Sequence, residues 1–373
     1  MKFDKYLGVG LLTITAFSVG TASVLAEGLE RVNLDTSFMF ESGTYAELGM
    51  GSVNPSIPAS WPGAGPVAAG SVDSVYKRFN VTNFAAKTQI GSNIHIGLWN
   101  TNQSSGVNLD WQSFPVNADL TVGATVGLVR YDLSDNFSIM GGVKALKMDS
   151  ATLERPTSLT EATAFSVGSA STSAPVYGVS YQRPDIALRV ELLAESAAEI
   201  SATTEYTTYS MLTGLPNGGM PASGPATLGI GDALTLNFQT GIAANTLLFG
   251  SVRNSKWKDN QVTVPVAGEI STFEDGQSYT VGLGRKFSES VSGSISTFYD
   301  PASGCDDVSA LSATCETRSI SLGAKIAMSD SMDLNLGTTW SRRGTATVTA
   351  LGGGASTTKS VVTSLGAKLS FKF

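Results

Sequence analysis

The sequence has little charge and almost no histidine. Charged residues make up 15% of the chain, whereas soluble domains average about 25%. The formal net charge is −7, which argues against a nucleic-acid partner because such proteins need a basic surface. The single histidine, His95, has no G-x-S-x-G or H-E-x-x-H motif around it, and no spacing singles out a nucleophile for it. The sequence therefore predicts no enzyme and no catalytic residue, and it implies no cofactor.

Only two cysteines are present, Cys305 and Cys315, ten positions apart in "GCDDVSALSATCE". In an exported protein the favoured interpretation is a disulfide that closes a small loop. Metal binding is the alternative, but no histidine lies nearby and two thiols are too few for a structural zinc site. We expect a disulfide here and no metal.

Long hydrophobic runs are missing outside the N-terminus. Lys2 and Lys5 precede an apolar run from Leu7 to Val19, and "SVLA" at 23–26 has small residues where signal peptidase cleaves. We interpret residues 1–26 as a secretory signal peptide. A membrane anchor is the alternative, although the run is shorter than the roughly 20 residues of a spanning helix. No later stretch reaches that length, which argues against a helical membrane protein.

The chain has instead a fine mixture of apolar and polar residues with 40 glycines. Such mixing suits a β-barrel in a bilayer, because lipid-facing and lumen-facing residues alternate along each strand. In the C-terminal stretch "SVVTSLGAKLSFKF", for example, Leu365 and Leu369 fall on one face and Lys368 on the other. We find fourteen candidate strands, at 44–54, 79–90, 93–103, 118–132, 136–149, 174–183, 186–206, 232–243, 246–258, 273–287, 291–300, 316–328, 332–343 and 358–373.

The connections between these candidates alternate in length. Every even-to-odd connection is tight and rich in turn residues, such as "LSDN" at 133–136 and "RPD" at 183–185, whereas every odd-to-even connection is long. In an up-and-down barrel this pattern places the short turns and both termini in the periplasm and the long loops outside the cell. The sequence thus predicts an all-β protein, a transmembrane up-and-down antiparallel β-barrel of about 14 strands at 44–373. We expect it in the outer membrane of a Gram-negative cell, with a short plug-like segment at 27–43 before the barrel.

Alternation also predicts which side chains face lipid. The expected lipid-facing sets are Leu120, Val122, Ala124, Val126 and Leu128; Ile186, Leu188, Val190, Leu192 and Ala194; Leu234, Leu236, Phe238 and Ile242; and Ile320, Leu322, Ala324, Ile326 and Met328. Charged side chains and His95 are expected in the lumen, because a charge facing lipid at mid-membrane costs about 2–4 kcal/mol. Aromatic residues near strand ends are expected to form interfacial girdles, namely Trp99, Tyr131, Tyr181, Trp257, Tyr299 and Trp340.

Several stretches resemble the FadL/TodX-type family of outer-membrane transporters for long-chain fatty acids and hydrocarbons. They are "LLFGSVRNSKWKDN" at 247–260, "FEDGQSYTVGLGRKFSESVSGSISTFYDPAS" at 273–303 and "FESGTYAELGMGSVNPSIPA" at 40–59. The resemblance implies passive transport of hydrophobic molecules through the barrel, with a sideways exit through a gap in its wall. The chain departs from the family because its segment before the first strand is short and lacks the Asn-Pro-Ala-Gly box, which implies a reduced plug. The aromatic residue Phe373 at the end of the last strand resembles the signal that outer-membrane barrels present to their assembly machinery.

Candidate ligand-binding residues fall into two groups. The first lies in apolar stretches of the third and fourth outer loops, which either form a capture surface or pack loop against loop as a lid: Phe165, Met211, Leu212, Leu215 and Met220. The second consists of inward cations that either bind a carboxylate headgroup or pair with neighbouring acids: Lys144, Arg189, Arg253 and Lys325. The expected partners are a hydrophobic small-molecule ligand, outer-membrane lipid and the barrel assembly machinery through Phe373. The alternatives are a general porin-like channel for small solutes and a structural or adhesive surface protein.

Overall fold

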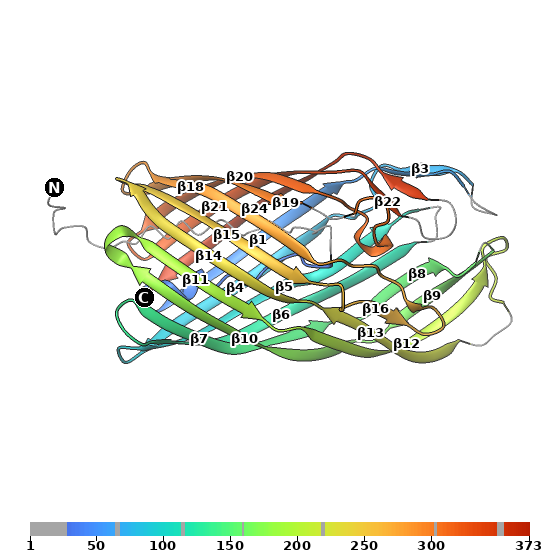
Figure 1. The fold of residues 1–373 in the computed structure, drawn as a ribbon, viewed down its shortest axis with the longest axis horizontal. Coiled ribbons are helices and arrows are strands. Elements are labelled where there is room, and N and C mark those ends of the chain that lie inside the picture. Colours follow the sequence, from blue (N-terminus) through green and yellow to red (C-terminus); the bar gives the residue numbers. More distant parts are fainter. Residues whose placement is uncertain are drawn as a thin grey trace.

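In the computed structural model, the described residues are 28–63, 68–112, 116–158, 160–217, 221–301, 304–348 and 354–373. The predicted signal peptide at 1–26 lies outside them. None of the described helices is long and apolar enough to cross a membrane. Nearly all of the ordered backbone is antiparallel strand, wrapped into a tilted barrel (Figure 1).

Fourteen strand positions form the barrel wall, as the sequence predicts. In order they are β1 (Tyr45–Ser56), β4 (Phe79–Ile90), β5 (Ile94–Asp110), β6 (Asn117–Asp132), β7 (Phe137–Met148), β10 (Ala170–Arg183), β11 (Leu188–Glu195) continued by β12 (Ala198–Ser210), β13 (Ala222–Ile230) leading into β14 (Asp232–Ala243), β15 (Thr246–Lys256), β18 (Gly276–Lys286), β19 (Val291–Asp300), β20 (Thr317–Ser329), β21 (Met332–Arg343) and β24 (Ser360–Lys372). The last strand pairs with the first from Tyr45↔Lys372 to Ser56↔Val361. This pairing closes the wall, so neither β1 nor β24 has a free edge.

Short turns gather at one end of the barrel and long loops at the other, and we call these the turn end and the loop end. The C-terminus, labelled C in Figure 1, lies at the turn end. At the loop end the wall is extended by β8 (Ala151–Pro156), β9 (Glu161–Val167), β12, β13, β16 (Val262–Val264) and β17 (Gly268–Glu269). A second, four-stranded sheet lies beside them, made of β2 (Ala59–Trp61), β3 (Gly70–Val72), β22 (Ala346–Val348) and β23 (Ala355–Thr357). Parts of the predicted loops are therefore strands.

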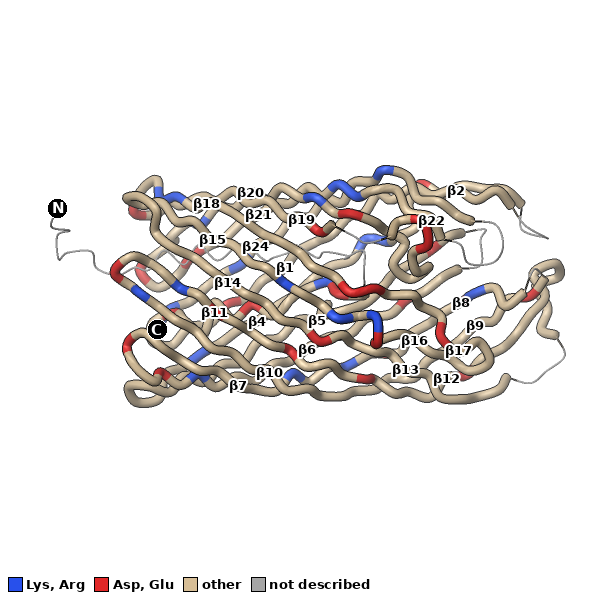
Figure 2. The backbone as a smooth tube through the Cα atoms, viewed as in Figure 1, with Lys and Arg blue, Asp and Glu red and all other residues tan. Residues whose placement is uncertain are grey.

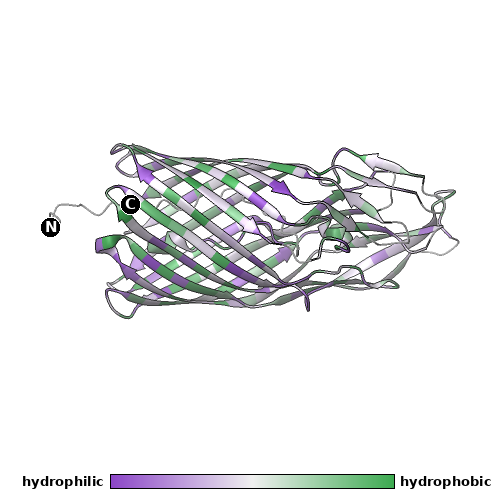
Figure 3. Cartoon of the chain, turned by 45° about the horizontal axis from the view of Figure 1, so that its top comes forward, coloured by the Kyte–Doolittle hydropathy of each residue, from purple (hydrophilic) through white to green (hydrophobic). Residues whose placement is uncertain are grey.

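The outside of the wall is apolar, as a bilayer requires. Leu236, Ile320 and Leu365 lie on the outside and are 39%, 54% and 67% exposed. Lys368, on the opposite face of the last strand from Leu365, points inward and is only 4% exposed. Figure 3 shows apolar and polar residues alternating along the strands, and in Figure 2 charged residues are sparse along the wall. The predicted lipid faces of 186–194, 234–242, 320–328 and 361–373 are thereby confirmed.

The predicted lipid face of β6 is wrong. Leu120, Val122, Ala124, Val126 and Leu128 are all buried and point inward. The outward face carries Thr and Gly, followed by the exposed residues Val129 and Tyr131. Arg130 shares the inward face, and keeping this charge out of lipid fixes the orientation, because lipid accepts threonine and glycine more readily than arginine.

Two of the predicted girdle tryptophans also lie inside the barrel. Trp99 is 2% exposed and Trp257 is completely buried. The ring of Trp257 covers Gly28, where a Cβ atom would come within 2.4 Å of it. Tyr131, Tyr299 and Trp340 are exposed on the outside, as predicted.

A bulge interrupts β5. Thr101 pairs with Ala124 and Ser105 with Val122, so three residues, 102–104, stand opposite one. The ladder of backbone pairs between β4 and β5 runs only from Ile90↔Ile94 to Asn83↔Thr101. Beyond it the side chain of Asn102, instead of the backbone, forms hydrogen bonds to β4. Its Oδ1 accepts from Thr82 N at 2.7 Å and its Nδ2 donates to Asn80 O at 3.4 Å. Thr101 Oγ1 also donates to Thr82 O at 3.3 Å, so two side chains hold the wall between β4 and β5 at this point.

Candidate functional site

Residues 28–44 lie inside the barrel and run along its wall before β1 begins. The backbone N–H groups of Arg31 and Val32 donate to Ser104 O at 2.9 and 3.3 Å, and Gly106 N donates to Leu29 O at 2.8 Å. The segment therefore pairs with the inner side of the β5 bulge and satisfies backbone groups that the bulge leaves free.

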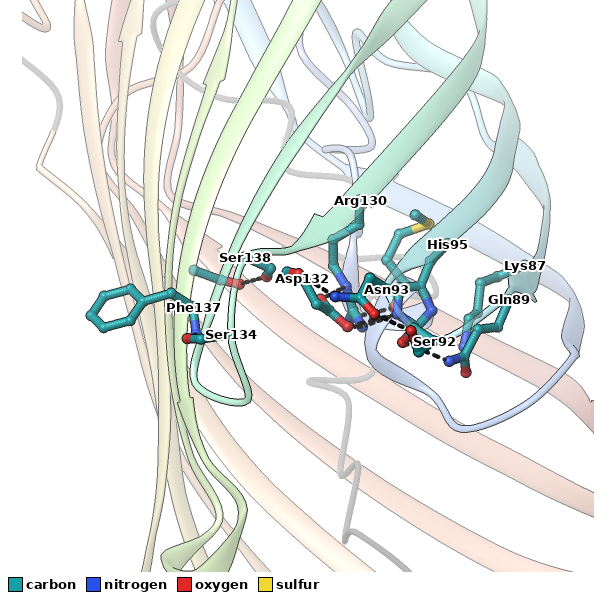
Figure 4. A network of polar contacts seen from close by, with 12 residues as sticks. Lys87, Gln89, Ser92, Asn93, His95, Arg130, Asp132, Ser134, Phe137 and Ser138 are labelled. Carbon is teal, nitrogen blue, oxygen red and sulfur yellow. Dashed lines mark hydrogen bonds and ion pairs between the residues drawn. The ribbon is translucent and has the colours of Figure 1, made fainter.

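A polar network holds the other end of this segment, near the turn end (Figure 4). Arg130 Nη1 donates to Met39 O at 2.6 Å, and Lys87 Nζ donates to Glu41 O. His95 Nε2 lies 2.8 Å from both Arg130 Nη2 and Asp132 Oδ2. These contacts fix the short 3-10 turn η1 (Ser37–Phe40), whose residues Phe38 and Met39 are buried. His95 faces the lumen, as predicted, and acts there in a structural network.

A second charged cluster lies at mid-lumen. Glu195 accepts from Lys144 Nζ at 2.9 Å and from Arg253 Nη1 at 2.8 Å. Arg253 also forms an ion pair with Glu30 of the N-terminal segment. All four side chains are at most 10% exposed. The cluster holds two acids and two bases, so its formal charge is zero.

The four predicted cationic ligand residues do not form one site. Lys144 and Arg253 meet at Glu195 in the mid-lumen cluster. The Arg189 guanidinium stacks over the Phe40 ring, 4.4 Å from its centroid, and Lys325 pairs with Asp333 at 2.9 Å. Lys144, Arg253 and Lys325 are paired with acids, which favours the structural alternative for them, whereas Arg189 Nη1 is buried without a hydrogen-bond partner. A ligand role for any of them stays a prediction.

An apolar cavity of about 50 Å³ lies within the loop-end half of the barrel. Among the described residues no charged side chain lines it, and its wall is apolar except for Thr152 and Thr227. Six of its lining residues come from six different strands: Leu120, Met148, Leu153, Val167, Ile200 and Leu228. The space exceeds the 10–15 Å³ or so that one water needs, but it offers a water few polar partners. We call this space the inner cavity.

A larger space of about 310 Å³ adjoins the inner cavity, and we call it the vestibule. Arg155, Glu269 and Asp307 lie among its lining residues, and the last two are exposed to solvent. Leu153, Ile270 and Leu311 line both spaces. The lining residues of the two spaces are thus continuous, and they follow the route of an apolar molecule from the loop end to the interior of the barrel.

None of the predicted loop residues that the structure describes lines the inner cavity itself. Phe165 lies directly behind its wall, buried against the lining residues Ala226 and Val264, and its ring centroid is 6.0 Å from that of Tyr206. Met211 is partly buried, Leu212 and Leu215 are 70% and 65% exposed, and Met220 lies outside the described residues. Their role in ligand capture stays a prediction. Cys305 and Cys315 are joined in the structure, with Cα atoms 5.4 Å apart.

Sequence reasoning missed the residues that line the inner cavity. Leu120 was assigned to lipid, although Arg130 on the same face of the strand was a signal for the lumen. Leu153, Val167 and Val262 belong to β8, β9 and β16, which lie in predicted loops. Their inward orientation depends on pairing between distant segments, such as Leu153↔Phe165 and Leu228↔Val262, and the local pattern does not reveal it.

No protein-family model and no curated protein sequence matches the chain. Solved structures do match it. A Pseudomonas aeruginosa FadL homologue has a TM-score of 0.72 at 14% identity, covering 90% of this chain and 92% of that chain. The Pseudomonas putida toluene transporter TodX has a TM-score of 0.67 at 12% identity, covering 95% and 96%. The Ralstonia pickettii toluene transporter TbuX has a TM-score of 0.57 at 11% identity, covering 89% and 90%. The fold is that of the FadL-type outer-membrane barrels.

Proposed function

We propose that the protein is an outer-membrane channel through which hydrophobic small molecules diffuse passively, with neutral hydrocarbons as its preferred ligands. The observation that carries this proposal is the inner cavity, because an aliphatic wall without charge favours an uncharged apolar guest. The names of the structural neighbours, a FadL homologue and toluene transporters, support it. Fatty acids are the second candidate class, but the predicted cationic partners for a carboxylate already face protein groups.

Residues 28–44 act as the plug in this proposal. They are anchored at the β5 bulge, at the mid-lumen cluster and at the turn-end network. A lumen filled in this way conducts few ions, which distinguishes the protein from a general porin. The short segment that the sequence places before the first strand is sufficient to make contacts at all three levels.

We infer that the ligand leaves sideways at the β5 bulge. Val107 lines the inner cavity, and the bulge at 102–104 precedes it in the same strand. The side chains of Asn102 and Thr101 supply the hydrogen bonds that bridge β4 and β5 there. A movement of these two side chains would open a path through the wall to the lipid phase of the membrane.

The test uses intact cells of a Gram-negative host, with and without the protein in the outer membrane. We expect faster uptake of the fluorescent hydrocarbon-like probe 1-N-phenylnaphthylamine in cells that carry it. Purified protein in planar bilayers should show little steady ion conductance. Large conductance without faster uptake would favour the porin alternative and refute the proposal. Competition by naphthalene but not by laurate would support neutral ligands over fatty acids.

A further inference from the structure

Leu153, Ile270 and Leu311 are the three residues that line both the vestibule and the inner cavity. They come from segments far apart in the sequence: β8, the segment after β17, and the 3-10 turn η3 (Ala310–Ser312). All three side chains are aliphatic. They therefore form the partition between the vestibule and the inner cavity, and we call them the partition residues.

Leu311 lies in a loop but is firmly held. It is 4% exposed, and its N–H donates to Ser309 Oγ at 3.3 Å. Two residues later, Ala313 N donates to Tyr76 Oη at 2.9 Å. The loop that carries it is closed by the Cys305–Cys315 disulfide.

The same loop is also tied to the second sheet. Thr347 of β22 donates through its N–H to Cys305 O at 2.8 Å and accepts from Val308 N at 2.9 Å. The turn thus has attachments before, at and after Leu311. Such attachments keep a short loop in one conformation, which a loop of this composition would not maintain alone.

We propose that the partition residues form the selectivity constriction of the channel and that Leu311 sets its width. This inference rests on the proposed function. A molecule that passes from the vestibule to the inner cavity must move past the three aliphatic partition residues. A charged or hydrated molecule loses its water shell there, and the partition residues offer no hydrogen bonds to replace it. The disulfide-closed loop serves to hold Leu311 in the path, so the constriction discriminates by width as well as by polarity.

The test compares uptake of 1-N-phenylnaphthylamine by intact cells that carry equal amounts of folded protein. The amount of folded protein is measured by its heat-modifiable migration on gels. Leu311→Trp should slow uptake about tenfold, since a larger side chain among the packed partition residues raises the barrier to passage. Leu311→Ala should accelerate uptake several-fold by widening the constriction. Leu365→Ala is the matched control, because Leu365 is 67% exposed on the outside of the barrel and lines neither space.

A second narrowing variant protects the test against misfolding. Ile270→Trp narrows the same constriction from another loop and should also slow uptake. Wild-type rates in both the Leu311→Trp and the Ile270→Trp proteins would overturn the constriction and leave the proposed function intact. Failure of the wild-type protein itself to accelerate uptake would instead refute the proposed function.

Discussion

Removal of the Glu195 charge should destabilise the barrel strongly, and a second substitution should restore much of the loss. In Glu195→Gln, Lys144 loses its carboxylate partner and Arg253 keeps only Glu30. Leaving a buried charge unpaired costs roughly 3–5 kcal/mol. In the double variant Glu195→Gln/Lys144→Met the cluster is neutral again, with Arg253 still paired to Glu30. We expect the double variant to be more stable than Glu195→Gln by about 2 kcal/mol or more.

The assay is urea unfolding of the protein in lipid vesicles, followed by tryptophan fluorescence and compared as free energies of unfolding. Asp149→Asn is the control, because the Lys147–Asp149 pair is 72% and 73% exposed. An exposed pair contributes only about 0–1 kcal/mol. A Glu195→Gln protein within about 1 kcal/mol of wild type, or a double variant no more stable than it, would refute the reasoning.

Three further predictions concern the plug, the wall and the contact of Tyr76 with the disulfide-closed loop. Gly97→Ala should raise ion conductance, because its Cβ would lie 2.1 Å from Met39 Sδ and displace η1, whereas Gly127→Ala, with nothing within 4 Å, should not. Asn102→Ala should accelerate probe uptake by weakening the bridge between β4 and β5, and an unchanged rate would argue against exit there. Burial raises the pKa of Tyr76 to about 12, so its neutral phenol stabilises the fold fully below about pH 10, and this contribution is lost as the pH rises through 12. Urea unfolding between pH 9 and 12 should show this loss in wild type but not in Tyr76→Phe.

The barrel could be predicted from the sequence because its two strongest signals are local. Alternation within strands and alternation of connection lengths both follow from pairing neighbours in the chain, and most wall strands fall within a few residues of their predicted ranges. The exceptions are β5, which extends to Asp110 beyond the predicted end at 103, and β13, which lies in a predicted loop. The strand predicted at 186–206 is divided into β11 and β12, because β11 pairs with β14 and β12 with β9 and β13. This change of partner involves distant segments and leaves no local pattern.

The interior was harder to predict, because an apolar lumen removes the contrast between the two faces of a strand. On β6 both faces lack strong polarity between 120 and 128, so only Arg130 distinguishes them. Trp257 shows the same limit, since a tryptophan near a strand end suits an interface, but here it covers Gly28 of the plug. Neither the plug's path nor the partition residues could be deduced without knowing which distant segments meet.

The free-energy cost of passage differs between the turn end of the lumen and the β5 bulge in the wall, and this difference favours a sideways exit. To continue toward the turn end, a hydrocarbon in the inner cavity must break buried charged contacts, such as those of Glu195 with Lys144 and Arg253. Separating one such pair costs roughly 3–5 kcal/mol, and the hydrocarbon would replace none of its interactions.

At the β5 bulge the bonds between the two strands are neutral: two from Asn102 and one from Thr101 Oγ1 to Thr82 O, each worth about 0.5–1.5 kcal/mol. On the inner side the plug adds backbone hydrogen bonds to Ser104 and Gly106, which are also neutral. Val107 lies three residues from Ser104, which at about 3.3 Å per residue places the bulge roughly 10 Å from the cavity wall. Beyond the bulge the molecule meets lipid, in which it is more soluble than in water. The neutral contacts and the more favourable destination therefore lie on the same side, at the gap between β4 and β5.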